Sequence, residues 1–217
     1  MSDNVREASG VMRIRDTPER WEVVDRQELC AGHVFRVRRD LVRMPKGDGT
    51  EVVARDVVEH PGSVGVLALD DEDRVLLVRQ YRHPIGYRLW EVPAGLRDVD
   101  GEPLWETAAR EFAEEAGHRA ERWHTLVDTF TSPGMGDERQ RVFLARGISE
   151  IPEGELDFER VHEEADMPVA WVPLDEAVAK VLGGDLRNPT AVVGILAAYA
   201  ARAGGFRDLR PADALDA

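Results

Sequence analysis

The chain has 217 residues, enough for one substantial hydrophobic core, and its 43% hydrophobic content is typical of an ordinary soluble globular protein. Its 42 acidic against 28 basic side chains give a net charge of -14, which would repel a nucleic-acid backbone or an anionic membrane surface and argues against both as large partners. A small phosphorylated molecule can still bind where an Arg cluster or a divalent cation reverses the local field.

The first quarter of the sequence predicts an antiparallel β extension after an unstructured start. Residues 1–19 are polar and lack periodicity, so we expect them to be poorly ordered. Runs rich in β-branched residues follow at 20–29, 33–45 and 51–60, and the Gly/Asp-rich segment KGDGT between the last two is typical of a hairpin turn. We interpret residues 20–60 as a small β unit that precedes the main domain.

A helix is expected at residues 102–117, after two strands at 63–70 and 74–83 that the charged turn DDED separates. Pro103 lies where the first turn of a helix tolerates proline, and Gly117 lies where a left-handed residue ends one. The residues with helical spacing that form its apolar stripe are Leu104, Ala108, Ala109, Phe112 and Ala116.

The same helix carries carboxylates whose spacing needs an explanation. Glu111 and Glu115 fall together along one edge of the apolar stripe, one turn apart, while Arg110 and Glu114 point further toward solvent. Like charges at this separation weaken a helix. A solvated charged face would account for them, since such faces are common, and so would a bound divalent cation, which turns the repulsion into attraction.

The rest of the chain predicts two more strands around a turn, then a strand and two helices. The segment SPGMGDE is the turn. The expected strands are 123–131, 139–147 and 168–174, and the expected helices are 175–184 and 189–203. Strands, a helix between strands and then helices indicate an α+β fold arranged as an α/β/α sandwich. The main domain is expected to cover 61–205, and 206–217 to form a C-terminal tail.

Cysteine usage and hydropathy favour a cytoplasmic protein. Cys30 is the single cysteine, so an intrachain disulfide is impossible and a reducing compartment is the simplest home. The N-terminal residues alternate in charge without the apolar core of a signal peptide, and the longest apolar run, AVVGILAAYAA, is too short to cross a bilayer. We therefore expect neither secretion nor membrane insertion.

The segment GLRDVDGEPLWETAAREFAEEAGH, which begins at Gly95, resembles the Nudix box. The matching residues are Gly95, Glu102, Arg110, Glu111, Phe112, Glu114, Glu115 and Gly117. Two features depart from the pattern: the spacer between Gly95 and Glu102 holds six residues instead of five, and His118 replaces an apolar residue. The longer spacer falls in a loop, where one extra residue costs little, and neither departure affects the helix carboxylates.

The resemblance implies the Nudix fold and a metal-dependent hydrolase that uses Mg²⁺ or Mn²⁺. The residues implied as metal ligands are the carbonyl of Ala94 and the carboxylates of Glu111, Glu114, Glu115 and Glu164. Such hard cations prefer oxygen ligands, and they activate water and stabilise charge on a diphosphate leaving group. Arg110 is implied to hold the carboxylates in place from the second shell of the site.

The similarity is closest to bacterial ADP-ribose pyrophosphatases, which split ADP-ribose into AMP and ribose 5-phosphate. The segments QYRH (80–83), LWEVPAG (89–95) and SPGMGDE (132–138) carry it, and Pro133 lies 16 positions after Gly117, where that group has a proline. Two alternatives stay open: a relative that prefers other nucleoside diphosphate sugars or dinucleotides, and a non-catalytic ligand sensor. The sensor is disfavoured because all three helix glutamates are present.

By the same resemblance, Arg55 and Arg82 match basic positions that hold ADP-ribose, and planar guanidinium groups suit phosphate oxygens. Leu96 and Glu138 match positions near the terminal ribose. Each residue also has an ordinary structural alternative. The Arg side chains could be solvated strand charges, Leu96 could belong to the core, and Glu138 could cap a turn.

The resemblance further implies a catalytic base and a homodimer. The acidic segment VHEEADMPVAW, residues 161–171, resembles the loop that supplies the base for the attacking water, and we expect Glu164 in this role with Glu163 behind it. A disordered acidic loop is the alternative. The strands at 20–60 resemble an extension that two protomers exchange, although packing on their own domain is also possible.

Overall fold

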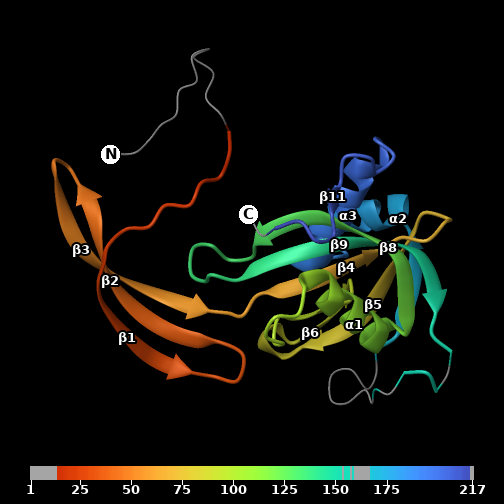
Figure 1. The fold of residues 1–217 in the computed structure, drawn as a ribbon, viewed down its shortest axis with the longest axis horizontal. Coiled ribbons are helices and arrows are strands. Elements are labelled where there is room, and N and C mark those ends of the chain that lie inside the picture. Colours follow the sequence, from red (N-terminus) through yellow and green to blue (C-terminus); the bar gives the residue numbers. More distant parts are fainter. Residues whose placement is uncertain (1–13, 153, 157, 159–166, 216–217) are drawn as a thin grey trace, which may run out of the picture.

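The computed structural model describes residues 14–152, 154–156, 158 and 167–215, and the strands in this part of the chain form three sheets (Figure 1). The first sheet projects away from the rest of the molecule. Its antiparallel strands are β1 (Val23–Ala31), β2 (Arg36–Lys46) and β3 (Gly49–Glu59), in that spatial order. The turn between β2 and β3 contains Gly47 with φ of 56°, a conformation that favours glycine. The predicted hairpin and β extension are therefore confirmed.

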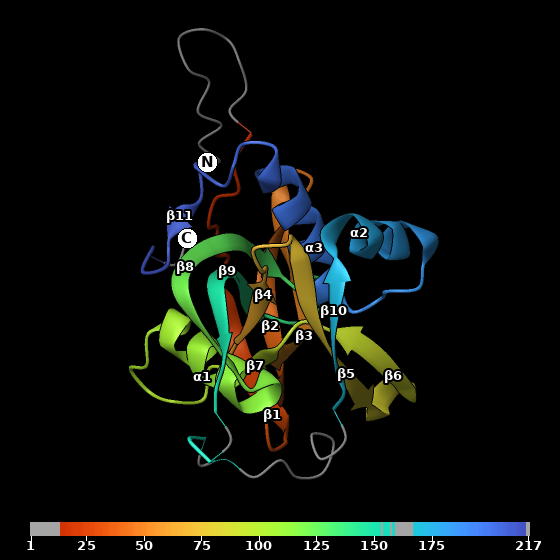
Figure 2. The same ribbon diagram turned by 90° about the vertical axis from the view of Figure 1, so that its right-hand side faces the viewer.

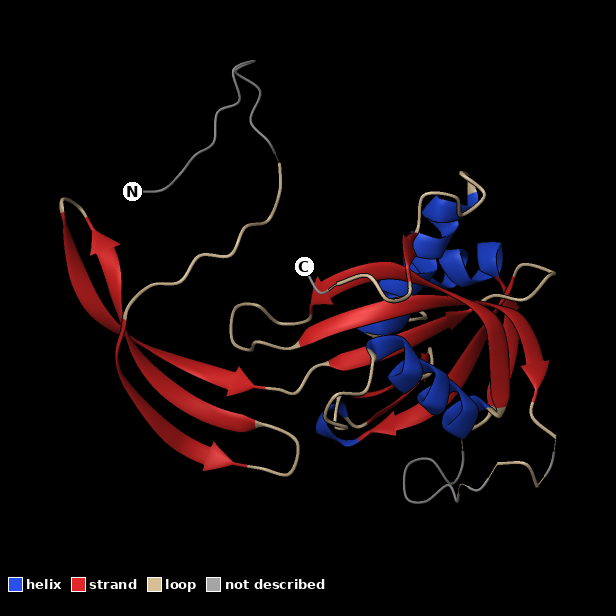
Figure 3. Ribbon diagram, viewed as in Figure 1, coloured by secondary structure: helices blue, strands red, loops and turns tan. Residues whose placement is uncertain are grey.

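The other two sheets form the middle of the main unit (Figure 3). The five-stranded sheet has the order β11-β8-β9-β4-β7, with β4 and β9 parallel. Its strands are β4 (Ser63–Ala68), β7 (Ala94–Leu96), β8 (His118–Phe130), β9 (Arg139–Glu150) and β11 (Arg210–Pro211). The three-stranded sheet has the order β10-β5-β6, and its strands are β5 (Arg74–Arg82), β6 (Tyr87–Glu91) and β10 (Val169–Pro173). A short 3-10 helix, η1 (His83–Ile85), joins β5 to β6.

Helices cover both faces of the five-stranded sheet, as Figure 2 shows for α1 on one side and α3 on the other. The three α-helices are α1 (Leu104–Ala116), α2 (Leu174–Gly183) and α3 (Pro189–Arg202). Successive residues of a strand point to opposite faces. Accordingly Val66 belongs to the core cluster under α1, whereas Leu67 belongs to the cluster under α2 and α3. The expected α+β sandwich is confirmed.

Local sequence signals set the limits of α1. Pro103 occupies the N-cap position, and Gly117 ends the helix with φ of 67°. The apolar stripe buries Ala108 and Phe112 completely against the sheets, and full burial of a side chain such as that of Phe112 contributes about 1.5–3 kcal/mol. The helix is thus fixed on the sheet by its apolar face, and its acidic edge lies beside the strand β7.

The loop between β8 and β9 forms backbone hydrogen bonds with the end of the N-terminal sheet. The Val58 N–H donates to the carbonyl of Met135 at 2.8 Å, and the Asp137 N–H donates to the carbonyl of Val58 at 3.1 Å. At the next residue, both carboxylate oxygens of Glu138 accept hydrogen bonds, from Ser63 at 2.8 Å and from Thr131 at 2.6 Å. The projecting sheet and this loop are therefore joined through the backbone.

Sequence reasoning did not predict three short strands, and it placed the start of a fourth too late. The strands β6, β7 and β11 were not expected, and β8 begins at His118 instead of residue 123. Residues 118–122 are mostly polar and lack β-branched side chains, but they pair with the far end of β9, up to Glu150. Within the described residues, no helix is both long and apolar enough to cross a membrane.

Candidate active site

Gly95 brings strand β7 against the acidic edge of α1. A Cβ atom placed on Gly95 would overlap the carboxyl group of Glu111. Any larger residue would therefore displace either the strand or this carboxylate. The glycine at the head of the box is required by this close approach, since its backbone φ is not positive.

Glu115 is attached to the same strand. Its side chain is 4% exposed, and its Oε2 atom accepts a hydrogen bond from the backbone N–H of Ala94 at 2.8 Å. Glu111 and Glu115, one helical turn apart, thus both face the chain segment Ala94–Gly95. The structure brings together these three positions that the sequence predicted as metal ligands.

Arg110 links the remaining carboxylates of the box. Its guanidinium donates to Glu111 at 2.9 Å, to Glu114 at 3.4 Å and to Glu102 at 3.3 Å. Glu102 also accepts from the hydroxyl of Thr107 at 2.8 Å. The extra spacer residue therefore leaves Glu102 within reach of Arg110, and the loop before it turns through Gly101, whose φ is 80°.

The electrostatic balance differs among these groups. Burial raises the pKa of Glu111 from its ordinary value of 4.5 to about 7; the charge of Arg110 opposes this shift and the charge of Glu114 adds to it. Hydrogen bonds from Arg110 and Thr107 hold the pKa of Glu102 below its ordinary range. Burial acts to lower the pKa of Arg110, but its acidic neighbours raise it on balance. The positive charge near Glu111 therefore does not offset the effect of burial on its pKa.

The donor set fits a hard divalent cation. Within the described residues, no three His, Cys, Asp or Glu side chains are grouped closely enough to hold a metal ion by themselves. The oxygen atoms along this edge come from Glu111 and Glu115, with Glu114 on the neighbouring face and the backbone at Ala94. Mg²⁺ is commonly bound by one or two carboxylates, with water and substrate phosphates completing its shell. A cation here would supply the charge that Glu111 lacks.

Metal-free protein should show the raised pKa of Glu111 as a pH-dependent stability. Because the folded-state pKa lies above the unfolded value, the contribution of this group is complete below about pH 4.5 and is lost as the pH rises through about 7. Glu111→Gln removes this loss. In EDTA, the melting temperature of the variant relative to the wild type should therefore rise from about pH 5 to about pH 8. A difference that stays constant would contradict the raised pKa.

Substituting Gly95 should disturb the metal ligands directly. Gly95→Ala places a methyl group where the carboxyl group of Glu111 lies, so we expect Mn²⁺ affinity to fall by about tenfold or more, as measured by calorimetry. Gly134→Ala is the matched control, because a Cβ atom on Gly134 meets nothing within 4 Å and its φ is not positive. Equal affinities for the two variants would show that the close approach is unimportant.

Two of the residues predicted to bind substrate lie beside the ends of β4 and β7. Leu96 is half-buried and pairs with Ser63 across the two strands. The hydroxyl of Ser63 donates to Glu138, whose carboxylate also lies 3.7 Å from the Nδ1 atom of His60. Leu96 and Glu138 are thus both next to Ser63, and Leu96 directly follows Gly95 in the chain.

Arg82 lies at the end of β5, where its guanidinium forms a forked ion pair with Glu91 at 3.0 and 2.7 Å. Glu91 is 1% exposed. Sequence reasoning missed this partner, since Glu91 is an isolated acid within an apolar segment. The apolar residues on both sides of Glu91, Leu89–Trp90 and Val92–Pro93, indicate that its carboxylate is buried. A buried carboxylate requires a partner of opposite charge.

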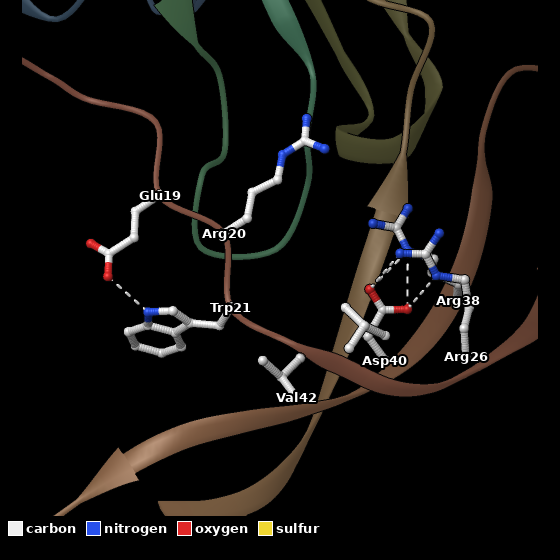
Figure 4. Close-up of a pocket in the computed structure, with 8 residues that line it drawn as sticks. Glu19, Arg20, Trp21, Arg26, Arg38, Asp40 and Val42 are labelled. Carbon is white, nitrogen blue, oxygen red and sulfur yellow. Dashed lines mark hydrogen bonds and ion pairs between the residues drawn. The ribbon is translucent and has the colours of Figure 1, made fainter. Parts of the chain in front are cut away.

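Arg55 lies on the projecting sheet, apart from the edge of α1. It is exposed on β3, and its guanidinium donates to the carbonyl of Ala54 at 2.9 Å. The same sheet carries an open hollow of about 680 Å³, where Arg26 and Arg38 both bind Asp40 and where Trp21 lies on one wall (Figure 4). Within this chain, Arg55 is therefore not brought together with Glu111 and Glu115.

The predicted base, Glu164, and its neighbour Glu163 lie outside the described residues. The strand that follows them in the chain, β10, pairs with β5, and its residue Val169 lies opposite Val78. His118, the departure at the end of the box, packs its ring against Phe112 and Trp171 at centroid distances of 6.0 and 5.8 Å. Its Nδ1 atom lies 2.6 Å from the carbonyl oxygen of Ala116, at the end of α1.

A model of the NUDIX domain matches residues 59–191. The ADP-ribose pyrophosphatase of Mycobacterium tuberculosis (strain ATCC 25618 / H37Rv) is 47% identical over 193 residues, which cover 89% of this chain and 89% of that protein. The ADP-ribose pyrophosphatase of Bacillus subtilis (strain 168) is 34% identical over 161 residues, which cover 74% and 82%.

A solved structure described as an ADP compounds hydrolase superposes with a TM-score of 0.67. It is 20% identical in sequence, and the match covers 89% of this chain and 100% of that one. At this identity the likeness concerns the fold alone.

Proposed function

The chain belongs to the Nudix family, and from this premise we propose that it hydrolyses the diphosphate of ADP-ribose to AMP and ribose 5-phosphate. The observation that carries the proposal is the 47% identity to an ADP-ribose pyrophosphatase across nearly the whole of both chains. The box carboxylates, anchored on Ala94 and Gly95, are the site at which we place the reaction.

The proposed metal site takes Mg²⁺ or Mn²⁺ on Glu111, Glu114 and Glu115 with the carbonyl of Ala94. When bound, the ion supplies positive charge to the diphosphate and to the attacking water. Arg110 keeps Glu111 and Glu114 in position through its hydrogen bonds. It acts on the substrate only through these carboxylates.

The proposed reaction adds one water across the diphosphate. The water oxygen bonds to one phosphorus atom, and the bridging P–O bond breaks. Glu164 is the proposed base that accepts the proton of the attacking water. The two phosphates leave as AMP and ribose 5-phosphate, so that no oxidant or further reactant is needed.

The proposed substrate contacts come from four residues. The guanidinium groups of Arg55 and Arg82 are assigned to the diphosphate and adenosine part, since planar donors match phosphate oxygens. Leu96 and Glu138 are assigned to the terminal ribose, and their common position next to Ser63 supports this pairing.

We further propose a homodimer built on the N-terminal sheet. Every residue of β1 is exposed in one protomer, and no α-helix packs on this sheet in the described part of the chain. Its exposed large apolar side chains are Val23, Val24, Leu29, Val34, Phe35 and Val52. A sheet that leaves such an apolar surface uncovered suits a symmetric partner. Light scattering after size-exclusion chromatography should give twice the 24.3 kDa mass of the chain, and a monomer would contradict the proposal.

The assay that tests the reaction is product analysis with a panel of substrates. Purified protein with Mg²⁺ or Mn²⁺ should convert ADP-ribose to equal amounts of AMP and ribose 5-phosphate, and EDTA should stop the conversion. Comparable kcat/KM values for several nucleoside diphosphate sugars or dinucleotides would replace ADP-ribose by a broader substrate class.

With a single cysteine in the chain, we place the enzyme in the reducing cytoplasm.

A further inference from the structure

Glu91 is a buried carboxylate that the proposed reaction does not use. It is the last residue of β6 and is 1% exposed. Both of its oxygen atoms accept hydrogen bonds from Arg82, at 3.0 Å from Nε and at 2.7 Å from Nη2. Burying an ion pair is costly, and apolar residues of similar size often stabilise a fold as well or better. The pair therefore needs a reason beyond stability.

The position of Glu91 in the sheets places it near the metal ligands. Glu91 lies opposite Val78 in the β5–β6 ladder, and residues directly opposite share one face. Val78 belongs to the core cluster beneath α1 together with Phe112 and Ala116, so Glu91 points to the α1 side. Ala94, whose N–H binds Glu115, lies only three positions after Glu91, and such a segment spans at most about 11 Å.

Arg82 is held at this place by its partner. Its side chain is 42% exposed while that of Glu91 is 2% exposed. The side chain of Arg82 is thus partly exposed, whereas the carboxylate that it binds is buried. The forked pair fixes the plane of the guanidinium group, which a single hydrogen bond would not do. A fixed, partly exposed cation on the α1 side of the β5–β6 ladder is suited to a diphosphate, which carries the opposite charge.

We propose that Glu91 is a positioning residue, which acts through Arg82 by fixing its guanidinium against the diphosphate of the substrate. The assignment rests on the proposed hydrolysis of ADP-ribose and extends it to a residue outside the box. Glu91 itself touches neither the substrate nor the metal ion.

The test compares Glu91→Gln with a control in which the carboxylate partner of another arginine of β5 is changed. Asp70 forms an ion pair with Arg74 at the opposite end of β5, at 2.7 Å and with a similarly exposed Arg side chain. Glu91→Gln should lower kcat/KM for ADP-ribose by about tenfold to a hundredfold, mainly through KM, because the diphosphate is charged before the bond breaks. Mn²⁺ affinity should not change. Asp70→Asn should lower the melting temperature without this kinetic effect.

A double-mutant cycle with Arg82→Lys decides whether Glu91 acts through Arg82. Lys cannot form the fork, so adding Glu91→Gln to Arg82→Lys should cause little further loss. Losses that multiply would overturn the proposal, and so would a kcat/KM for Glu91→Gln within about twofold of that for Asp70→Asn. Should Glu91→Gln not fold, Glu91→Asp keeps the charge but withdraws it by one methylene group, and an unchanged KM for that variant would likewise overturn the proposal.

The wild-type assay separates this proposal from the one beneath it. Absence of ADP-ribose turnover by the wild type would refute the proposed function and this assignment with it. Turnover by the wild type together with unaltered kinetics of the Glu91 variants would refute the positioning role alone.

Discussion

Glu115→Gln is expected to lower kcat/KM for ADP-ribose by on the order of a thousandfold, because it removes a charged ligand from the proposed cation site. The substitution should be well tolerated by the fold. The Gln side chain has the same length, and its carbonyl oxygen can still accept the N–H of Ala94, as Glu115 does at 2.8 Å. Steady-state kinetics should be combined with Mn²⁺ titration by calorimetry, in which the affinity for the ion should also fall.

The matched control is Glu106→Gln, which makes the same chemical change on the same helix. Glu106 lies in the first turn of α1 and is exposed. Its replacement should leave both turnover and Mn²⁺ affinity near the wild-type values. If Glu115→Gln retains most of the activity, or if both variants lose activity equally, the carboxylate of Glu115 does not hold a catalytic ion.

Glu164→Gln is expected to lower kcat by on the order of a hundredfold to ten-thousandfold, the range for loss of a general base. The affinity for ADP-ribose should stay nearly the same, since the proton is transferred only as the bond to phosphorus forms. Rapid-mixing kinetics would separate binding from the chemical step, and the pH profile of kcat should lose its acidic limb.

Glu163→Gln provides the comparison for the base, because it changes the neighbouring carboxylate of the same segment. We expect this variant to retain more activity than Glu164→Gln. The reverse order would transfer the role of base to Glu163. A large loss of substrate affinity in Glu164→Gln would instead make Glu164 a binding residue.

The elements that the sequence predicted well are those with local signals. Helix α1 was expected at 102–117 and extends over Leu104–Ala116, because Pro103, Gly117 and the apolar stripe define its ends and its buried face. The strands β6 and β7 were missed for the opposite reason. They have only five and three residues, too few for a clear alternating pattern, and β7 pairs with β4, which lies well before it in the chain.

The box predicted the family and the positions of the acidic residues around Arg110, since a motif on one helix and its preceding loop fixes their spacing. The sequence could not reveal that Glu91 binds Arg82, nor that Ser63 lies between Leu96 and Glu138. Those neighbours come from different strands. The placement of Arg55 illustrates a further limit, because its sequence position did not reveal that it lies on the projecting sheet, apart from the edge of α1.

The backbone hydrogen bonds between Val58 and the β8–β9 loop connect the N-terminal sheet mechanically to Glu138. Backbone hydrogen bonds join Val58 to Met135 and Asp137, and Glu138 follows immediately. A pulling force on the N-terminal sheet, from a bulky fusion or a surface tether, would therefore be transmitted to Glu138. Attachment at the exposed Asp185, in the turn after α2, would place no force on this connection.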